Sequence, residues 1–64
     1  MSEEQARALA ANVERMLGWL TEIWEGADGQ WYVLARRDTD PLTHFVLRNQ
    51  RDWEQLHKLL SEVV

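Results

Sequence analysis

The first part of the chain carries apolar residues at the spacing of a helix, with polar residues between them. Apolar residues recur at steps of three and four, which is typical of an amphipathic helix with one buried face. The stripe is made of Ala6, Leu9, Ala10, Val13, Met16 and Leu17. Ser2 and Gln5 form a capping-box pattern, with Ser2 as the N-cap and Gln5 as the third helical residue. The pattern therefore predicts a helix that begins after Ser2.

The end of this helix allows two interpretations. Gly18 is a common type of residue directly after a helix, so the helix could end near Leu17. The apolar stripe nevertheless continues, and the alternative is a longer helix to Glu25, followed by a two-stranded hairpin and a C-terminal helix. The residues that continue the stripe are Leu20, Ile23 and Trp24. We favour the shorter helix, because Asp28-Gly29 between apolar runs signals a hairpin and because three strands hold a helix-covered face better than two.

Three strands and a second helix follow in this interpretation. The strands are expected at residues 19–25, 30–37 and 43–49, with aspartate and proline in the turn between the last two. Asp52 is expected as the N-cap of the final helix. The apolar face of that helix is marked by Trp53, Leu56, Leu59, Leu60 and Val63. The pattern predicts a single α+β domain over residues 1–64, in the order α-β-β-β-α, with a three-stranded antiparallel sheet packed on two helices.

Cross-strand pairing assigns each side chain to one face of this sheet, because side chains alternate along a strand. We set Trp24 opposite Trp31, and Ala35 opposite Phe45. The face expected under the helices then carries Leu20, Glu22, Trp24, Trp31, Val33, Ala35, Phe45 and Leu47. The other face carries Trp19, Thr21, Ile23, Tyr32, Leu34, Arg36, His44, Val46 and Arg48. A slip of one residue in the register would exchange the faces.

The second face is the candidate site for a protein partner. With both helices on one side of the sheet, it would expose aromatic and aliphatic side chains beside arginines, and such patches often mark interaction sites. Tyrosine, tryptophan and arginine are also enriched at binding hot spots. The expected partner-binding residues are Trp19, Ile23, Tyr32, Leu34, Arg36, Val46 and Arg48. The alternative is that the helices cover both faces of the sheet, which would leave no such surface.

Composition and charge narrow the classes of partner. The chain has 64 residues with 11 acidic and 7 basic side chains, a net charge of −4 and no cysteine. Direct nucleic-acid binding is not expected, because it usually needs a basic face. An acidic surface suits instead a mimic of nucleic acid, with Glu14, Glu22, Glu25 and Asp28 as the candidate residues. We find no signal-peptide pattern and no apolar run of membrane-span length, and the lack of cysteine agrees with a cytoplasmic protein.

Few residues of the chain could carry chemistry. Asp38, Asp40 and His44 could ligate a divalent cation, but aspartate beside proline is ordinary in a turn, so no metal or cofactor is expected. Ser2 and Ser61 lie near the chain ends, where the buried geometry of a catalytic triad is hard to build. The chain is therefore not expected to be an enzyme.

The sequence favours a non-catalytic function. We expect a small acidic protein-binding module that regulates or inhibits a larger protein assembly. In size and charge the chain is similar to small acidic proteins of phages and mobile elements that block host defence or transcription machinery, a similarity of type that involves no sequence motif. One alternative is a nucleic-acid-mimicking inhibitor that acts through its acidic surface. Another is an accessory protein that forms a homodimer through two outer sheet faces.

Overall fold

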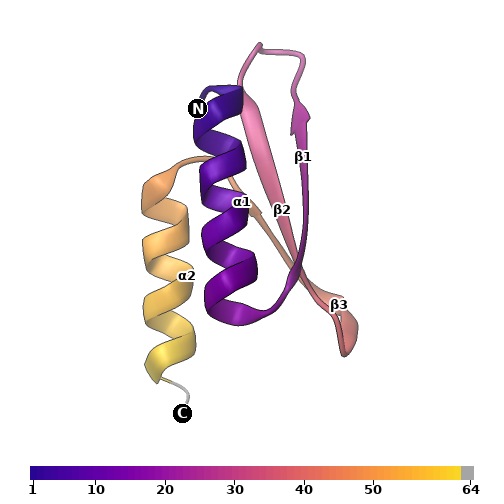
Figure 1. The fold of residues 1–64 in the computed structure, drawn as a ribbon, viewed down its shortest axis with the longest axis vertical. Coiled ribbons are helices and arrows are strands. Elements are labelled where there is room, and N and C mark those ends of the chain that lie inside the picture. The colour runs from indigo at the N-terminus through magenta and orange to yellow at the C-terminus, as the bar shows by residue number, and fades with distance from the viewer. Residues whose placement is uncertain (63–64) are drawn as a thin grey trace.

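The chain forms two helices and three strands in the order α1-β1-β2-β3-α2 (Figure 1). The computed structural model describes residues 1–62, except for the side chain of Pro41, so Val63 of the predicted helix face lies outside the described residues. The elements are α1 (Glu3–Leu17), β1 (Leu20–Glu25), β2 (Trp31–Arg37), β3 (Asp40–Leu47) and α2 (Gln50–Glu62). The strands form an antiparallel sheet in the order β1-β2-β3. The predicted α+β fold is confirmed.

Helix α1 is bounded by residues that satisfy the free backbone groups at its ends. The Ser2 Oγ accepts a hydrogen bond from the Gln5 N–H (3.1 Å), and the Ser2 N–H donates to Gln5 Oε1 (2.9 Å). Gly18 takes a left-handed conformation with φ of 68°, and its N–H donates to the Glu14 carbonyl (2.9 Å). Residues with a side chain rarely take this conformation, so glycine ends the helix here. The shorter of the two predicted helices is the correct one.

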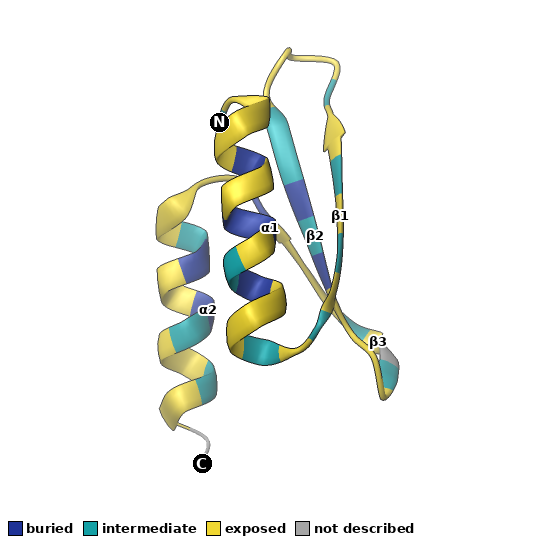
Figure 2. Cartoon of the chain, viewed as in Figure 1, coloured by how far each residue is buried: buried dark blue, intermediate teal, exposed yellow. Residues whose placement is uncertain are grey.

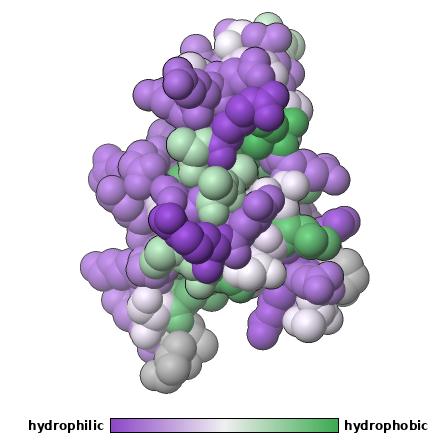
Figure 3. All heavy atoms as spheres, viewed as in Figure 1, coloured by the Kyte–Doolittle hydropathy of each residue, from purple (hydrophilic) through white to green (hydrophobic). Residues whose placement is uncertain are grey.

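Both helices lie on the same side of the sheet, and the buried residues face the space between the layers (Figure 2). The core consists of Ala6, Leu9, Ala10, Val13, Val33, Ala35, Leu47, Trp53 and Leu56. The alternative in which the helices cover both faces of the sheet is therefore wrong. On the side drawn in Figure 3, hydrophilic side chains cover most of the surface and hydrophobic ones show in small patches. Neither described helix has the length and the apolar run that a bilayer crossing requires.

The β1–β2 hairpin has a different register from the one predicted. Gly26 and Gln30 close the loop through a 2.8 Å hydrogen bond from the Gly26 N–H to the Gln30 carbonyl, and Gly29 is left-handed with φ of 79°. The loop proper is therefore Ala27-Asp28-Gly29, and three-residue hairpin loops with glycine in this conformation are common. An odd loop length pairs Trp24 with Tyr32 instead of Trp31. This one-residue slip exchanges the two faces of β1.

The β2–β3 pairing follows the prediction in its regular part. Ala35 lies opposite Phe45, as expected, but β3 begins at Asp40 instead of residue 43 and ends at Leu47 instead of residue 49. The early start follows from a tight turn over residues 38–39 and from an irregularity between Arg36 and Arg37. Bulges of this kind give one strand additional residues without ending the pairing.

Helix α2 begins two residues before the predicted N-cap. Asn49 takes the capping role, because its Oδ1 accepts a hydrogen bond from the Asp52 N–H (2.9 Å). Asparagine is a favoured N-cap, and an aspartate in the first turn interacts well with the positive end of the helix dipole. Asp52 lies within the first turn and accepts a further hydrogen bond from the Arg48 N–H (2.9 Å). The prediction of Asp52 as the N-cap is therefore wrong.

Candidate functional site

The sheet face turned away from the helices carries the candidate site, which we call the outer face. Its members alternate along each strand with the residues that point into the core. They are Leu20, Glu22 and Trp24 of β1, Tyr32, Leu34 and Arg36 of β2, His44 and Val46 of β3, and Arg48 directly after β3. Both helices lie on the opposite side of the sheet, so no described element covers this face (Figure 1).

Cross-strand pairing arranges the outer face in rows. The rows are Trp24–Tyr32, Glu22–Leu34–Val46 and Leu20–Arg36–His44. Leu34 occupies the middle of the face, on the central strand between Glu22 and Val46. Leu20, Trp24 and Val46 are 45%, 40% and 49% exposed, respectively. The outer face thus has an apolar residue at its centre, with an acid beside it on β1, a base further along β2 and a second base directly after β3.

Five of the seven predicted partner-binding residues lie on the outer face. They are Tyr32, Leu34, Arg36, Val46 and Arg48. The predicted placement of Trp19 and Ile23 is wrong, because both pack against the core on the helix side. The Trp19 ring stacks on Phe45 with centroids 6.0 Å apart, and Ile23 pairs with buried Val33. Whether the five residues bind a partner stays a prediction.

Leu20 and Trp24 take the places that the sequence assigned to Trp19 and Ile23. The missed signal is whether the hairpin loop has an odd or an even number of residues. Glycine at residue 29 suits the left-handed last position of a three-residue loop. Counting the loop in this way would have put Trp24 opposite Tyr32 and turned both missed residues outward.

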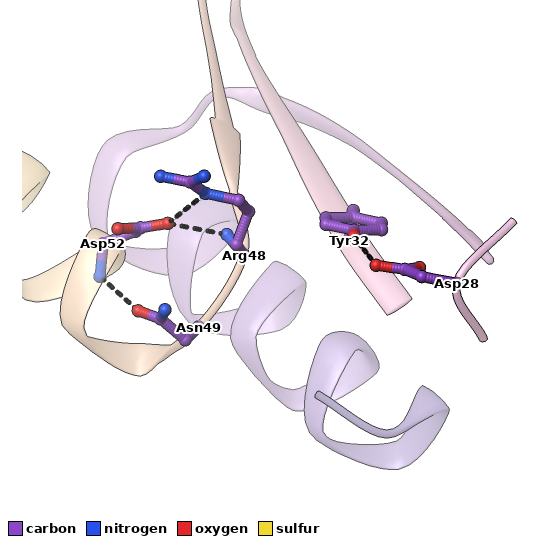
Figure 4. A network of polar contacts seen from close by, with 5 residues as sticks. All are labelled: Asp28, Tyr32, Arg48, Asn49 and Asp52. Atoms are coloured by element: carbon purple, nitrogen blue, oxygen red, sulfur yellow. Dashed lines mark hydrogen bonds and ion pairs between the residues drawn. The ribbon is translucent and has the colours of Figure 1, made fainter. Parts of the chain in front are cut away.

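Trp24 and Tyr32 form an ordered aromatic pair at one end of the outer face. Their rings stack with centroids 5.5 Å apart, and the Tyr32 hydroxyl donates a hydrogen bond to Asp28 Oδ2 (2.5 Å; Figure 4). Asp28 Oδ1 also accepts from the Gln30 N–H (3.0 Å). The Tyr32 hydroxyl and then the Gln30 N–H lower the pKa of Asp28, and the hydrogen bond to Asp28 raises the pKa of Tyr32. The hairpin loop therefore holds the tyrosine ring in place.

The two arginines of the outer face differ in their partners. Arg48 Nε lies 3.5 Å from Asp52 Oδ2, so this charge is partly balanced by the first turn of α2 (Figure 4). Within the described part of the chain, Arg36 and Glu22 make neither an ion pair nor a side-chain hydrogen bond. The outer face therefore presents one unpaired positive and one unpaired negative side chain among the described residues.

The four candidate residues of the acidic surface are not gathered on one face. Glu14 lies on α1 and accepts a hydrogen bond from the Thr21 Oγ1 (2.5 Å) on the helix side of β1. Glu22 lies on the outer face, Glu25 at the end of β1, and Asp28 in the hairpin loop. The fold therefore distributes these charges around the β1 edge and engages two of them in hydrogen bonds.

Of the three candidate cation ligands, Asp40 is engaged in hydrogen bonds at the start of β3. Asp40 accepts hydrogen bonds from the Thr43 Oγ1 (2.5 Å) and the Leu42 N–H (3.2 Å). Both bonds lower the pKa of Asp40, and the bond from Thr43 has the larger effect. His44 lies opposite Arg36 on the outer face. Among the described residues, no three histidine or acidic side chains come together as a metal site would require.

One hollow brings a serine and a histidine together without forming a nucleophilic pair. The hollow has a volume of 440 Å³ and is lined by Met16, Leu17, Trp19, Arg37, His57, Leu60 and Ser61. The Ser61 hydroxyl donates to the His57 backbone carbonyl (2.8 Å), while the His57 ring lies against Trp53 at a centroid distance of 5.4 Å. A base that activates serine must instead accept the hydroxyl proton through its ring nitrogen.

Comparison with known proteins finds no family model, no curated protein and no solved structure that matches this chain.

Proposed function

We propose that the chain is a non-catalytic protein-binding module whose contact surface is the outer face. The observation that carries the proposal is the position of Leu34. This leucine lies half-buried at the centre of the sheet, beside Val46 and Tyr32 and next to the charged Glu22 and Arg36, on a face that no described element covers. An uncovered apolar centre with charged residues around it is the arrangement of a protein interface.

The composition of the outer face supports protein recognition. Trp24, Tyr32 and Arg36 belong to the residue types that contribute most at interfaces. The aromatic pair is already ordered by stacking and by the hydrogen bond from Tyr32 to Asp28. Binding through ordered side chains loses less conformational entropy than binding through mobile ones.

The regulatory or inhibitory role expected from the sequence fits a surface of this kind. A regulator of a larger assembly needs a contact surface and no catalytic group. The chain has no cysteine, which agrees with the proposed cytoplasmic location. The nucleic-acid mimic has less support, because Glu14 and Asp28 accept internal hydrogen bonds and lie in different layers of the fold.

Photo-crosslinking from single positions tests the proposal. A photoreactive phenylalanine analogue replaces Val46, which is 49% exposed on the outer face, or Ala11, which is exposed on α1, as the control. Each protein is irradiated in a native cell lysate, and the covalent adducts are identified by mass. We expect a defined adduct from position 46 and none from position 11. Absence of any adduct from position 46, or equal adducts from both positions, would overturn the proposal.

A further inference from the structure

We infer that the partner of the outer face is a second copy of this chain, packed face to face about a two-fold axis. The inference rests on the proposed function, because it uses the same surface. An interface of this symmetry must be self-complementary. If residue i of the first copy contacts residue j of the second, then residue j of the first copy also contacts residue i of the second. The arrangement of residues around Leu34 meets this condition.

Leu34 has an acid and a base as neighbours in two perpendicular directions. Glu22 lies across from Leu34 on β1, and Arg36 lies two residues further along β2 on the same face. In the opposite directions are two uncharged residues, Val46 on β3 and Tyr32 on β2. Both charged side chains are exposed and have no ion pair among the described residues. They are therefore available to a partner.

Two of the four symmetric arrangements about Leu34 bring one of its two charged neighbours, Glu22 or Arg36, onto its own counterpart. A two-fold axis parallel to the strands places Arg36 of one copy on Arg36 of the other, because this residue lies on the same strand as Leu34. An axis across the strands places Glu22 on Glu22, because the row that contains Leu34 lies along that axis. Like charges that face each other across an interface strongly disfavour association.

The two diagonal axes bring different residues together. One places Glu22 on Tyr32 of the partner subunit, and Arg36 on Val46 of the partner subunit, so it buries charges against uncharged groups. The other places Glu22 on Arg36 of the partner subunit, and Tyr32 on Val46 of the partner subunit. Only this second diagonal pairs opposite charges and also joins apolar side chains.

This diagonal is compatible with the dimensions of a sheet. Neighbouring strands lie about 4.8 Å apart, and two residues along a strand span about 6.8 Å, so after a rotation of about 90° the two spacings differ by about 2 Å. Strands of the two copies then cross at about 90°, which is one of the two common ways in which sheets pack on each other. Long side chains such as Glu22 and Arg36 accommodate the remaining difference.

Further contacts extend along the same diagonal. Leu34 and Leu20 lie on the axis and each meets its own counterpart, while Trp24 meets His44 of the partner subunit. Arg48, which continues β3 opposite Tyr32, also lies on this axis and meets Arg48 of the partner subunit, and its charge is partly balanced by Asp52. A typical stable interface buries about 800 Å² of each partner, which is about a sixth of the 4659 Å² surface of this chain. Small domains without disulfides often gain stability from a partner subunit.

Charge exchange at one contact tests the dimer. In Glu22→Arg, both symmetric contacts become pairs of bases, and in Arg36→Glu both become pairs of acids. We expect sedimentation velocity to show a dimer for the unchanged chain and at least about a tenfold weaker self-association for each variant. In an equimolar mixture, one copy of each variant regains opposite charges at both contacts, so a heterodimer should form. The double variant Glu22→Arg/Arg36→Glu should also dimerise.

Matched controls separate the interface from net charge and from folding. Glu4→Arg and Arg15→Glu make the same changes of net charge on exposed positions of α1 and should leave dimerisation unchanged. Circular dichroism checks that every variant is folded. The mixing result is decisive, because Glu22 and Arg36 are also neighbours within one chain, and mixing two variants restores no contact inside either chain.

The outcomes distinguish this inference from the proposed function. A monomer at every concentration, or single variants that associate like the unchanged chain, would overturn the dimer. If position 46 then still crosslinks to another protein in lysate, the binding function stands with a foreign partner. If it crosslinks to nothing, both fail. An adduct of twice the chain mass in lysate, together with rescue in the mixture, supports both.

Discussion

Trp24 stacks on Tyr32 across the β1–β2 pair, with ring centroids 5.5 Å apart and an angle of 26° between the ring planes. Both side chains belong to the outer face. Pairing Trp24 with Trp31, as the sequence suggests, would have turned Trp24 into the core. The aromatic end of the proposed binding surface therefore depends on the length of the hairpin loop, which decides the face of every residue in β1.

The register predicts opposite sensitivities for two aliphatic residues of β1. Ile23→Ala should lower the free energy of unfolding by about 2 kcal/mol, because Ile23 packs against the core. Leu20→Ala should cost less than about 1 kcal/mol, because Leu20 is 45% exposed. Urea unfolding at low protein concentration, where a dimer would dissociate, measures both values. A larger loss for Leu20→Ala than for Ile23→Ala would contradict the observed register.

Gly26 is expected to be intolerant of a side chain because of the Tyr32 ring. A Cβ at residue 26 would lie 2.6 Å from Tyr32 Cε2 and 2.9 Å from Asp28 Oδ1. Gly26→Ala should therefore destabilise the fold by about 1–3 kcal/mol, as overpacking usually does. The same substitution in a Tyr32→Ala background is the control, and there the cost should largely disappear. Equal costs in the two backgrounds would show that the ring is not the obstacle.

Gly18→Ala distinguishes the observed helix end from the longer helix by the sign of its effect. Gly18 has a φ of 68°, and a Cβ there would meet no atom within 4 Å, so only backbone strain opposes alanine. The substitution should destabilise the fold by about 1 kcal/mol. In a continuous helix the same change would stabilise by about 1 kcal/mol, because alanine is the better helix former. Thermal and urea unfolding both report the sign.

The hydrogen bond between Tyr32 and Asp28 predicts a pH-dependent contribution to stability. The lowered pKa of Asp28 means that its contribution is present above the ordinary aspartate pKa and is lost as pH falls through the lowered value. The raised pKa of Tyr32 means that its contribution is present below the ordinary tyrosine pKa and is lost as pH rises through the raised value. Stability should therefore benefit from this bond over the neutral range.

Tyr32→Phe removes the hydroxyl and keeps the ring. We expect the variant to melt at a lower temperature than the unchanged chain at neutral pH, with a difference that shrinks in acid and in alkali. Thermal unfolding across the pH range measures this difference, and Asp28→Asn serves as the companion variant. A difference between Tyr32→Phe and the unchanged chain that does not vary with pH would show that the bond contributes little.

Much of the fold could be predicted because its signals are local. The capping box of Ser2 and Gln5 and the helical stripe of α1 involve residues within a few positions of each other. The β2–β3 register was also predicted through Ala35 and Phe45. The start of α2 was missed because Asn49 and Asp52 are both capable caps, and the structure uses Asn49.

The outer face was only partly predictable, because β1 carries apolar residues on both faces. Either of two residue pairs is apolar enough to pack in the core: Trp19 with Ile23, or Leu20 with Trp24. The hydrophobic pattern does not choose between them, whereas the positions on β2 follow from the burial of Val33 and Ala35. The residues predicted for the outer face on β2 and β3 lie on that face, whereas Trp19 and Ile23 do not, and partner binding by this face stays a prediction.

The sequence by itself determined the order of the elements, the start of the first helix with its N-cap, and the polar character of the turns, because these depend on neighbouring residues. Only the tertiary structure decided which face of β1 is covered. The reason is the hairpin loop of Ala27, Asp28 and Gly29, whose odd length turns Trp24 toward Tyr32 and Ile23 toward the core. A local backbone conformation at Gly29 thereby selects the side chains that the chain presents to a partner.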